Sequence, residues 1–132
     1  MGNTDEYQQL DKKYYMPAFS RDMAIVKGKG SKVWDAQGKE YLDCVAGIAV
    51  CNTGHCHPAV VKALCDQANE LIHCSNLYYI PHQGELAKKL VEVTGMHKAF
   101  FANSGAEATD GALKLARVRT GRKKFVAFTH GF

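Results

Sequence analysis

Residues Ala99–Phe128 read AFFANSGAEATDGALKLARVRTGRKKFVAF, and this stretch decides the fold. An apolar run, KAFFA, ends at Asn103 in small and polar residues, and alanine and leucine then recur at helical spacing from Ser104 to about Arg119. A second apolar run, KKFVAF, follows the helix pattern. Strand, helix and strand in this order predict a βαβ unit, and hence an α/β fold whose large sheet is mainly parallel.

The first half of the chain has a different pattern. Residues 1–20 predict a polar arm with an aromatic knot, and residues 24–50 predict a small antiparallel β-meander with a turn at Asp35–Gly38. Apolar residues at helical spacing then predict one helix from Pro58 to about Ile72 and another from about Gln83 to Thr94. The loop between these helices is rich in aromatic and hydrogen-bonding side chains, which is typical of functional loops.

The residues after the apolar run, NSGAE, have two explanations. Ser104 and Glu107 match the S-x-x-E capping box, in which two free amides at a helix start are satisfied reciprocally. Capping does not explain Gly105, because a glycine early in a helix costs up to about 1 kcal/mol relative to alanine. Free amides and the positive end of the helix dipole, just after a parallel strand, also favour a bound phosphate. From the motif alone, capping and phosphate binding both stay open.

Composition excludes several classes of protein. The 132 residues are 46% apolar and 23% charged, with a net charge of +4, as in ordinary globular domains. No run approaches the roughly 18 apolar residues of a membrane span, and the polar start is unlike a signal peptide, so we expect a cytoplasmic protein. The basic cluster at residues 117–124 lies at a predicted helix end without interleaved aromatics, so no nucleic-acid partner is expected.

Cysteine usage indicates a reducing compartment. The cysteines number five, with no CxxC pair, which argues against a disulfide framework. The HCHP stretch, His55–Pro58, raises a metal site as an alternative, because His55 and His57 would share one face of an extended segment. Its spacing matches no closed zinc pattern, so we predict no metal site and assign these histidines a structural role.

The chain as a whole resembles the class III, fold-type I aminotransferases that use pyridoxal phosphate (PLP). The similarity lies in FFANSGAEATDGALKLAR together with four further stretches in order: VKGKGSKVWDAQGKEYLDCVAGIAV, GHCHPAVVKAL, SNLYY and HGF. The resemblance implies that residues 1–57 form an N-terminal arm and small-domain segment, and that residues 58–132 begin the large cofactor domain. It also implies a homodimer.

Site residues follow from the same resemblance. It implies that Ser104, Gly105 and Ala106 hold the cofactor phosphate and that Phe132 stacks on the pyridine ring. It places Ile48 and Tyr79 near the substrate, although strand core is an equal alternative for Ile48 and plain core packing is one for Phe132. No catalytic residue is assigned. The lysine that forms a Schiff base with the cofactor, the aspartate that pairs with the pyridine nitrogen and the arginine that binds the substrate carboxylate have no match in the 132 residues.

The implied activity is transfer of an amino group from N-acetylornithine to 2-oxoglutarate in arginine biosynthesis, with this chain as the N-terminal third of the enzyme and inactive alone. Ornithine, 4-aminobutyrate or succinylornithine is the alternative donor. An alternative outside the enzymes is a truncated, non-catalytic fragment that interacts with another protein.

Overall fold

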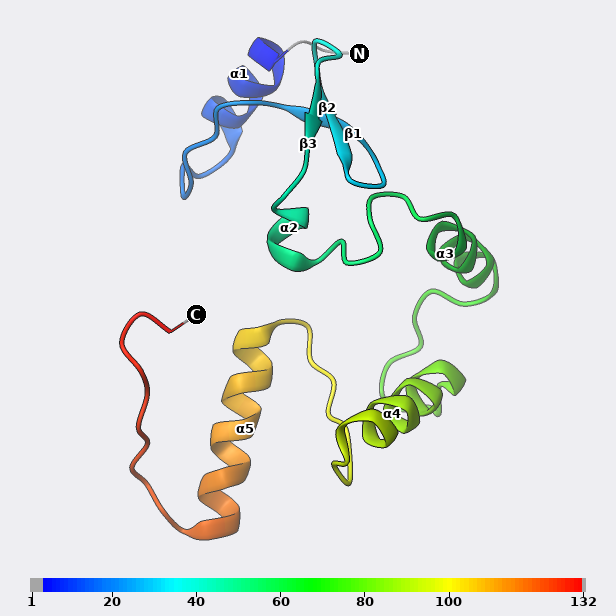
Figure 1. Cartoon of the computed structure of the whole chain (residues 1–132). Coiled ribbons are helices and arrows are strands. Elements are labelled where there is room, and N and C mark those ends of the chain that lie inside the picture. The colour runs from blue at the N-terminus through cyan, green and yellow to red at the C-terminus, as the bar shows by residue number, and fades with distance from the viewer. Residues whose placement is uncertain (1–3, 132) are drawn as a thin grey trace. The chain divides into compact units, whose positions relative to one another are not determined.

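The computed structural model describes residues 4–131, which fall into two compact units divided between Cys74 and Ser75 (Figure 1). The first unit contains the elements α1 (Thr4–Tyr14), β1 (Ile25–Lys29), β2 (Lys32–Asp35), β3 (Glu40–Leu42), α2 (Ala46–Ala49) and α3 (Pro58–Glu70). The second contains α4 (Pro81–Thr94) and α5 (Gly105–Thr120). Within the described range, no helix is both long and apolar enough to cross a bilayer.

The β-meander is confirmed. The three strands form one antiparallel sheet in the order β1-β2-β3, and Val33 of the middle strand lies opposite Gly28 on one side and Tyr41 on the other. Among the described residues, Val33 is the only apolar side chain in the buried class, at 8% exposed. The middle strand therefore holds the small core of this sheet.

Asp35 organises the turn between β2 and β3. Its Oδ1 accepts hydrogen bonds from the backbone amides of Gln37 (3.0 Å) and Lys39 (2.9 Å), and its Oδ2 accepts one from the Tyr41 hydroxyl at 2.8 Å. The Tyr41 hydroxyl, followed by the two amides, lowers the pKa of Asp35 below its ordinary value. Gly38 completes the turn with φ +83°, a conformation that glycine adopts without a steric penalty.

We predict that Asp35→Ala destabilises the sheet, because it leaves two backbone amides and the Tyr41 hydroxyl without their shared acceptor. The thermal unfolding midpoint should fall by about 3 °C. Asp35→Asn keeps an acceptor at Oδ1 and should lose less than half as much. Equal losses in the two variants, measured by differential scanning calorimetry, would contradict this explanation.

The first unit differs from the sequence analysis in two ways. The polar N-terminal arm contains a helix that was not predicted, α1, which Asp5 and Glu6 in the first turn and Lys12 and Lys13 in the last turn stabilise through the helix dipole. The meander also stops at Leu42, before the expected end at residue 50. The amides of Val45 and Ala46 bond to the Asp43 carboxylate and are therefore not available to a sheet ladder.

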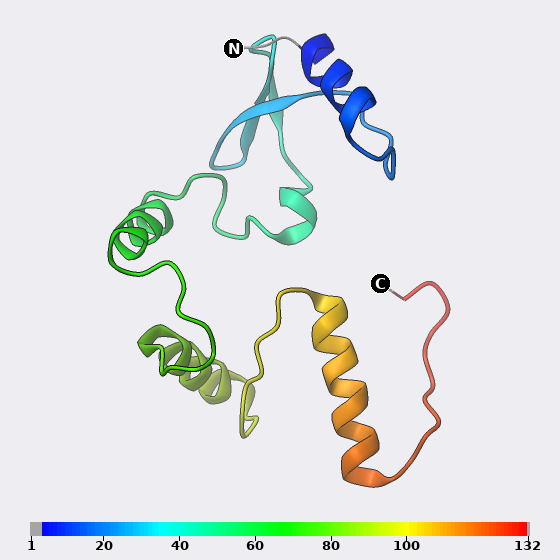
Figure 2. The same ribbon diagram turned by 180° about the vertical axis from the view of Figure 1, so that it is seen from behind.

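Helices of the second unit agree with the prediction, with α4 ending at a left-handed Gly95 and α5 at a left-handed Gly121. The flanking segments 98–102 and 121–128 form no strand, and Figure 2 draws both as coil. A parallel strand requires a neighbouring strand for its amides and carbonyls, and within the described residues neither segment has one. The described residues therefore lack the strand-to-strand hydrogen bonds of a βαβ unit.

Aromatic side chains from both flanking segments nonetheless contact α5. A side-chain carbon added to Gly111 would lie 3.2 Å from the Phe100 ring, so this ring packs on the helix backbone. After the helix, the Arg117 guanidinium lies 4.9 Å from the centre of the Phe125 ring. One aromatic ring from each flanking segment therefore lies against α5.

Candidate functional site

The capping box at the start of α5 is formed. Ser104 is the N-cap residue, with extended backbone (φ −148°, ψ 160°), and its Oγ accepts a hydrogen bond from the Glu107 amide at 3.2 Å. In return, the Glu107 carboxylate accepts one from the Asn103 amide at 2.7 Å. This geometry confirms the capping explanation for Ser104 and Glu107.

Capping leaves two amides at the helix start available. The Ala108 amide bonds to the Ser104 carbonyl at 3.0 Å, whereas the amides of Gly105 and Ala106 have no acceptor within residues 4–131. A side-chain carbon built on Gly105 would meet no atom within 4 Å, so the space beside this backbone is open. The same helix start is therefore capped and still able to donate two hydrogen bonds to an anion.

The remaining predicted site residues lie elsewhere. Ile48 belongs to α2 in the first unit, is 73% exposed and is outside every strand, so the strand-core alternative is wrong. Tyr79 is fully exposed in the loop before α4, in the same unit as Ser104. Phe132 lies outside the described residues. Of the predicted set, the structure brings together only Ser104, Gly105 and Ala106.

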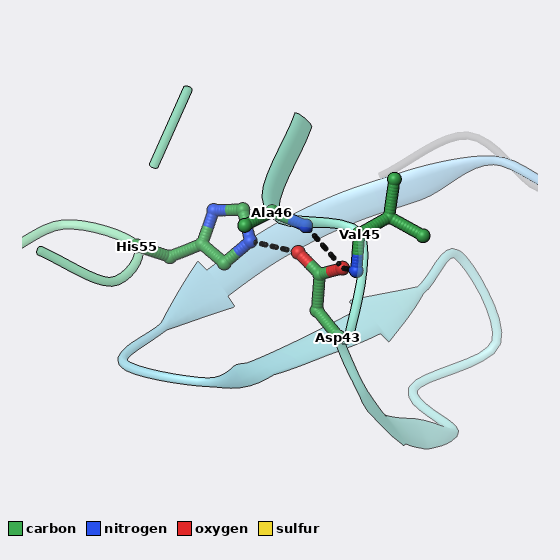
Figure 3. Close-up of polar contacts among 4 residues, drawn as sticks. All are labelled: Asp43, Val45, Ala46 and His55. Atoms are coloured by element: carbon green, nitrogen blue, oxygen red, sulfur yellow. Dashed lines mark hydrogen bonds and ion pairs between the residues drawn. The ribbon is translucent and has the colours of Figure 1, made fainter. Parts of the chain in front are cut away.

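A pair that the sequence analysis did not single out, Asp43 and His55, joins two segments of the first unit through a part-buried hydrogen bond (Figure 3). The Asp43 Oδ2 lies 2.6 Å from His55 Nε2, and its Oδ1 accepts from the amides of Val45 (2.8 Å) and Ala46 (2.9 Å). The His55 side chain, then the Ala46 and Val45 amides, lower the pKa of Asp43 to about 2.

The same bond bears on the alternative of a metal site at HCHP. His55 is occupied by Asp43, and His57 precedes α3 as its N-cap. Across the residues that the structure describes, no group of three histidine, cysteine or carboxylate side chains is placed to hold a metal ion. Asp43 directly follows β3 and lies twelve positions before His55, and no local sequence pattern links the two residues.

Acid should weaken this part of the fold. Because the folded pKa of Asp43 is lower than its unfolded value, the pair stabilises the protein fully above pH 3.8 and progressively less as the pH falls toward about 2. In acid unfolding followed by circular dichroism, Asp43→Asn should show a shallower loss of stability over this range than the wild type. Parallel curves would contradict the assignment.

Comparison with known proteins identifies the family. The family model for class-III aminotransferases matches residues 15–132. This chain belongs to the class-III aminotransferases. A curated relative, the acetylornithine aminotransferase of Methanosarcina mazei, is 58% identical over 129 residues, which are 97% of this chain and 33% of the relative. The chain thus spans about a third of the length of the curated relatives it matches.

Solved structures place the chain in the same class. Ornithine aminotransferase from Toxoplasma gondii superposes with a TM-score of 0.83 at 35% identity, over 89% of this chain and 28% of that one. Taurine:2-oxoglutarate aminotransferase from Bifidobacterium kashiwanohense, solved with PLP and glutamate, gives a TM-score of 0.86 at 31% identity, over 94% and 29% of the two chains. These neighbours confirm the expected fold class, the start of a fold-type I PLP-transferase.

Proposed function

We propose that this chain is the N-terminal part of a PLP-dependent aminotransferase that transfers an amino group from N-acetylornithine to 2-oxoglutarate. The observation that carries the proposal is the start of α5, where two unpaired amides point from a capped helix terminus beside a glycine with open space around it. The choice of N-acetylornithine is supported by the name of the relative that is 58% identical over almost the whole chain.

The start of α5 fits the phosphate group of PLP. The amides of Gly105 and Ala106 would donate to the phosphate oxygens, and the Ser104 hydroxyl, which accepts from Glu107, retains its own proton to donate. The positive end of the helix dipole favours the phosphate charge. PLP, when bound, supplies an electron sink for the carbanion formed at the substrate carbon.

This chain's own contribution to the reaction is binding and orientation. Anchoring the phosphate at three successive residues fixes the position of the cofactor relative to the start of α5. Ile48 and Tyr79 offer exposed apolar surface, which we assign to the amino donor, and Phe132 remains assigned to the ring face. The Schiff-base lysine, which moves the proton in such enzymes, has no match here, so the 132 residues alone should not transaminate.

The wider assignment includes a cytoplasmic location and a homodimer. All five cysteines are free thiols, as is usual in a reducing compartment. Apolar side chains are exposed along the chain, among them Leu115, Val118 and Val126. Surfaces of this kind require further protein to cover them, which supports packing against the rest of a larger, dimeric enzyme.

The test is a donor panel with the full-length enzyme, PLP and 2-oxoglutarate, following glutamate formation. We expect kcat/KM for N-acetylornithine to exceed that for ornithine, 4-aminobutyrate, succinylornithine and taurine by at least about tenfold. The second candidate is an ω-aminotransferase for unacylated ornithine, which the likeness to the T. gondii enzyme favours. Preference for ornithine would select that candidate, and no glutamate from any donor would overturn the proposed activity.

A further inference from the structure

The short element α2 is a left-handed turn. Its four residues, Ala46 to Ala49, all have positive φ, at 51°, 66°, 58° and 61°. Only Gly47 adopts this conformation without a penalty, and Ile48 (φ 58°, ψ 57°) is β-branched, for which the left-handed region is a strong outlier. A strained turn persists only where its surroundings hold it, and such turns cluster at functional sites.

Asp43 holds the start of this turn. Its Oδ1 binds the amides of Val45 and Ala46, and the Ala46 carbonyl then accepts from the amides of Val50 and Cys51 at 2.9 Å each. The carboxylate therefore fixes the two residues from which the left-handed turn begins. The other oxygen, Oδ2, joins Asp43 to His55 (Figure 3).

His55 is itself fixed to the β1–β2 hairpin. Its amide donates to the Gly30 carbonyl at 2.8 Å, and its carbonyl accepts from the Gly30 amide at 2.9 Å. Its ring packs against the backbone of Gly28, where an added side-chain carbon would lie 2.6 Å from the ring Cγ. Asp43 before the turn and His55 after it are thus bonded to each other, and His55 is bonded to the β1–β2 hairpin.

We propose that Asp43 and His55 are positioning residues that hold the left-handed turn in place, so that Ile48 presents its side chain to the amino donor. The proposal rests on the proposed function for the role of Ile48. The bond between Asp43 and His55 itself rests only on the geometry of the first unit. In this role both residues act through the turn and not on the donor itself.

Asp35 provides a matched control. Like Asp43, it is a carboxylate at a strand end that accepts from two backbone amides and one side chain, but its turn does not contain Ile48. Asp35→Ala and Asp43→Ala should both lower stability. Only the second should change how the donor binds.

In the full-length holoenzyme, Asp43→Ala should raise KM for the amino donor about tenfold and change kcat less than about twofold, as expected for a lost contact made equally in ground and transition states. His55→Ala should act in the same direction. Asp43→Asn should restore most of the affinity, because its Oδ1 still accepts and its amide donates to Nε2 of the other His55 tautomer. Asp35→Ala should leave KM within about twofold of wild type.

Amide hydrogen exchange separates the positioning role from the proposed activity. Exchange at residues 45–50 should accelerate at least about tenfold in Asp43→Ala and His55→Ala and stay unchanged in Asp35→Ala, whether or not the wild-type enzyme transaminates. An enzyme without activity but with this exchange pattern would overturn the proposed function and the donor role of Ile48, while leaving the Asp43–His55 support for the turn intact. Unchanged exchange in the first two variants, or accelerated exchange with an unchanged KM, would overturn the positioning role.

Discussion

Replacing Gly105 with aspartate should weaken PLP binding to the full-length enzyme by at least about 100-fold, because a carboxylate and a phosphate about 4 Å apart near a protein surface repel by several kcal/mol. The folded protein should tolerate the change. An added Cβ meets no atom within 4 Å, and an acidic residue in the first turn of α5 interacts favourably with the helix dipole. A large loss of PLP affinity with unchanged folding stability is the result expected of a residue in a ligand site.

Gly105→Asn is the matched control for charge. It has the shape of aspartate without the negative charge, so it should lose less affinity than Gly105→Asp. Gly84→Ala in α4 is the control for glycine itself, because its added carbon also meets nothing within 4 Å. That variant should gain up to about 1 kcal/mol in stability and leave PLP affinity unchanged. Equal PLP affinities in wild type and Gly105→Asp, by fluorescence titration, would exclude a phosphate at this position.

Helix capping can be separated from phosphate binding by substituting the two residues of the capping box. Both substitutions should lower stability, but only that of Ser104 should lower PLP affinity. Ser104→Ala should cost about 1 kcal/mol of stability through the lost bond to the Glu107 amide. It should also lower PLP affinity about tenfold or more, because it removes a hydroxyl that donates to a charged group. Stability is measured by urea unfolding of the apoenzyme, and affinity by titration with PLP.

Glu107→Ala should also lower stability, by about 0.5–1 kcal/mol, because the Asn103 amide loses its acceptor and the helix start loses an acidic residue. PLP affinity should stay the same or rise, because one negative charge near the phosphate has been removed. Parallel losses of stability and affinity in both variants would mean that Ser104 acts only as a cap.

Local signals predicted much of this structure. Ser104 and Glu107 predicted a cap that is formed, and Gly95 predicted the end of α4, because caps and C-terminal glycines act within one turn. The Asp35–Gly38 turn was readable for the same reason. By contrast, the strands around α5 require partners from other parts of a sheet, and a local apolar run cannot supply them.

The candidate site likewise contains residues that local sequence predicts and residues that depend on distant contacts. Ser104, Gly105 and Ala106 are consecutive, so their common location follows from sequence alone. The left-handed turn at Ile48 was not predicted, because alanine, isoleucine and alanine disfavour that conformation and nothing local requires it. It depends on Asp43 and on His55, which is twelve residues further along the chain. Contacts of this range escape pattern reading unless the two residues are already known to pair.

A crystal structure of the full-length enzyme with PLP is the most direct test of phosphate binding at α5. The phosphate oxygens should lie about 2.7–3.1 Å from the amide nitrogens of Gly105 and Ala106 and within hydrogen-bond distance of Ser104 Oγ, with the bond between Glu107 and Asn103 retained. A phosphate bound elsewhere, with those two amides covered by other protein groups, would contradict the assignment.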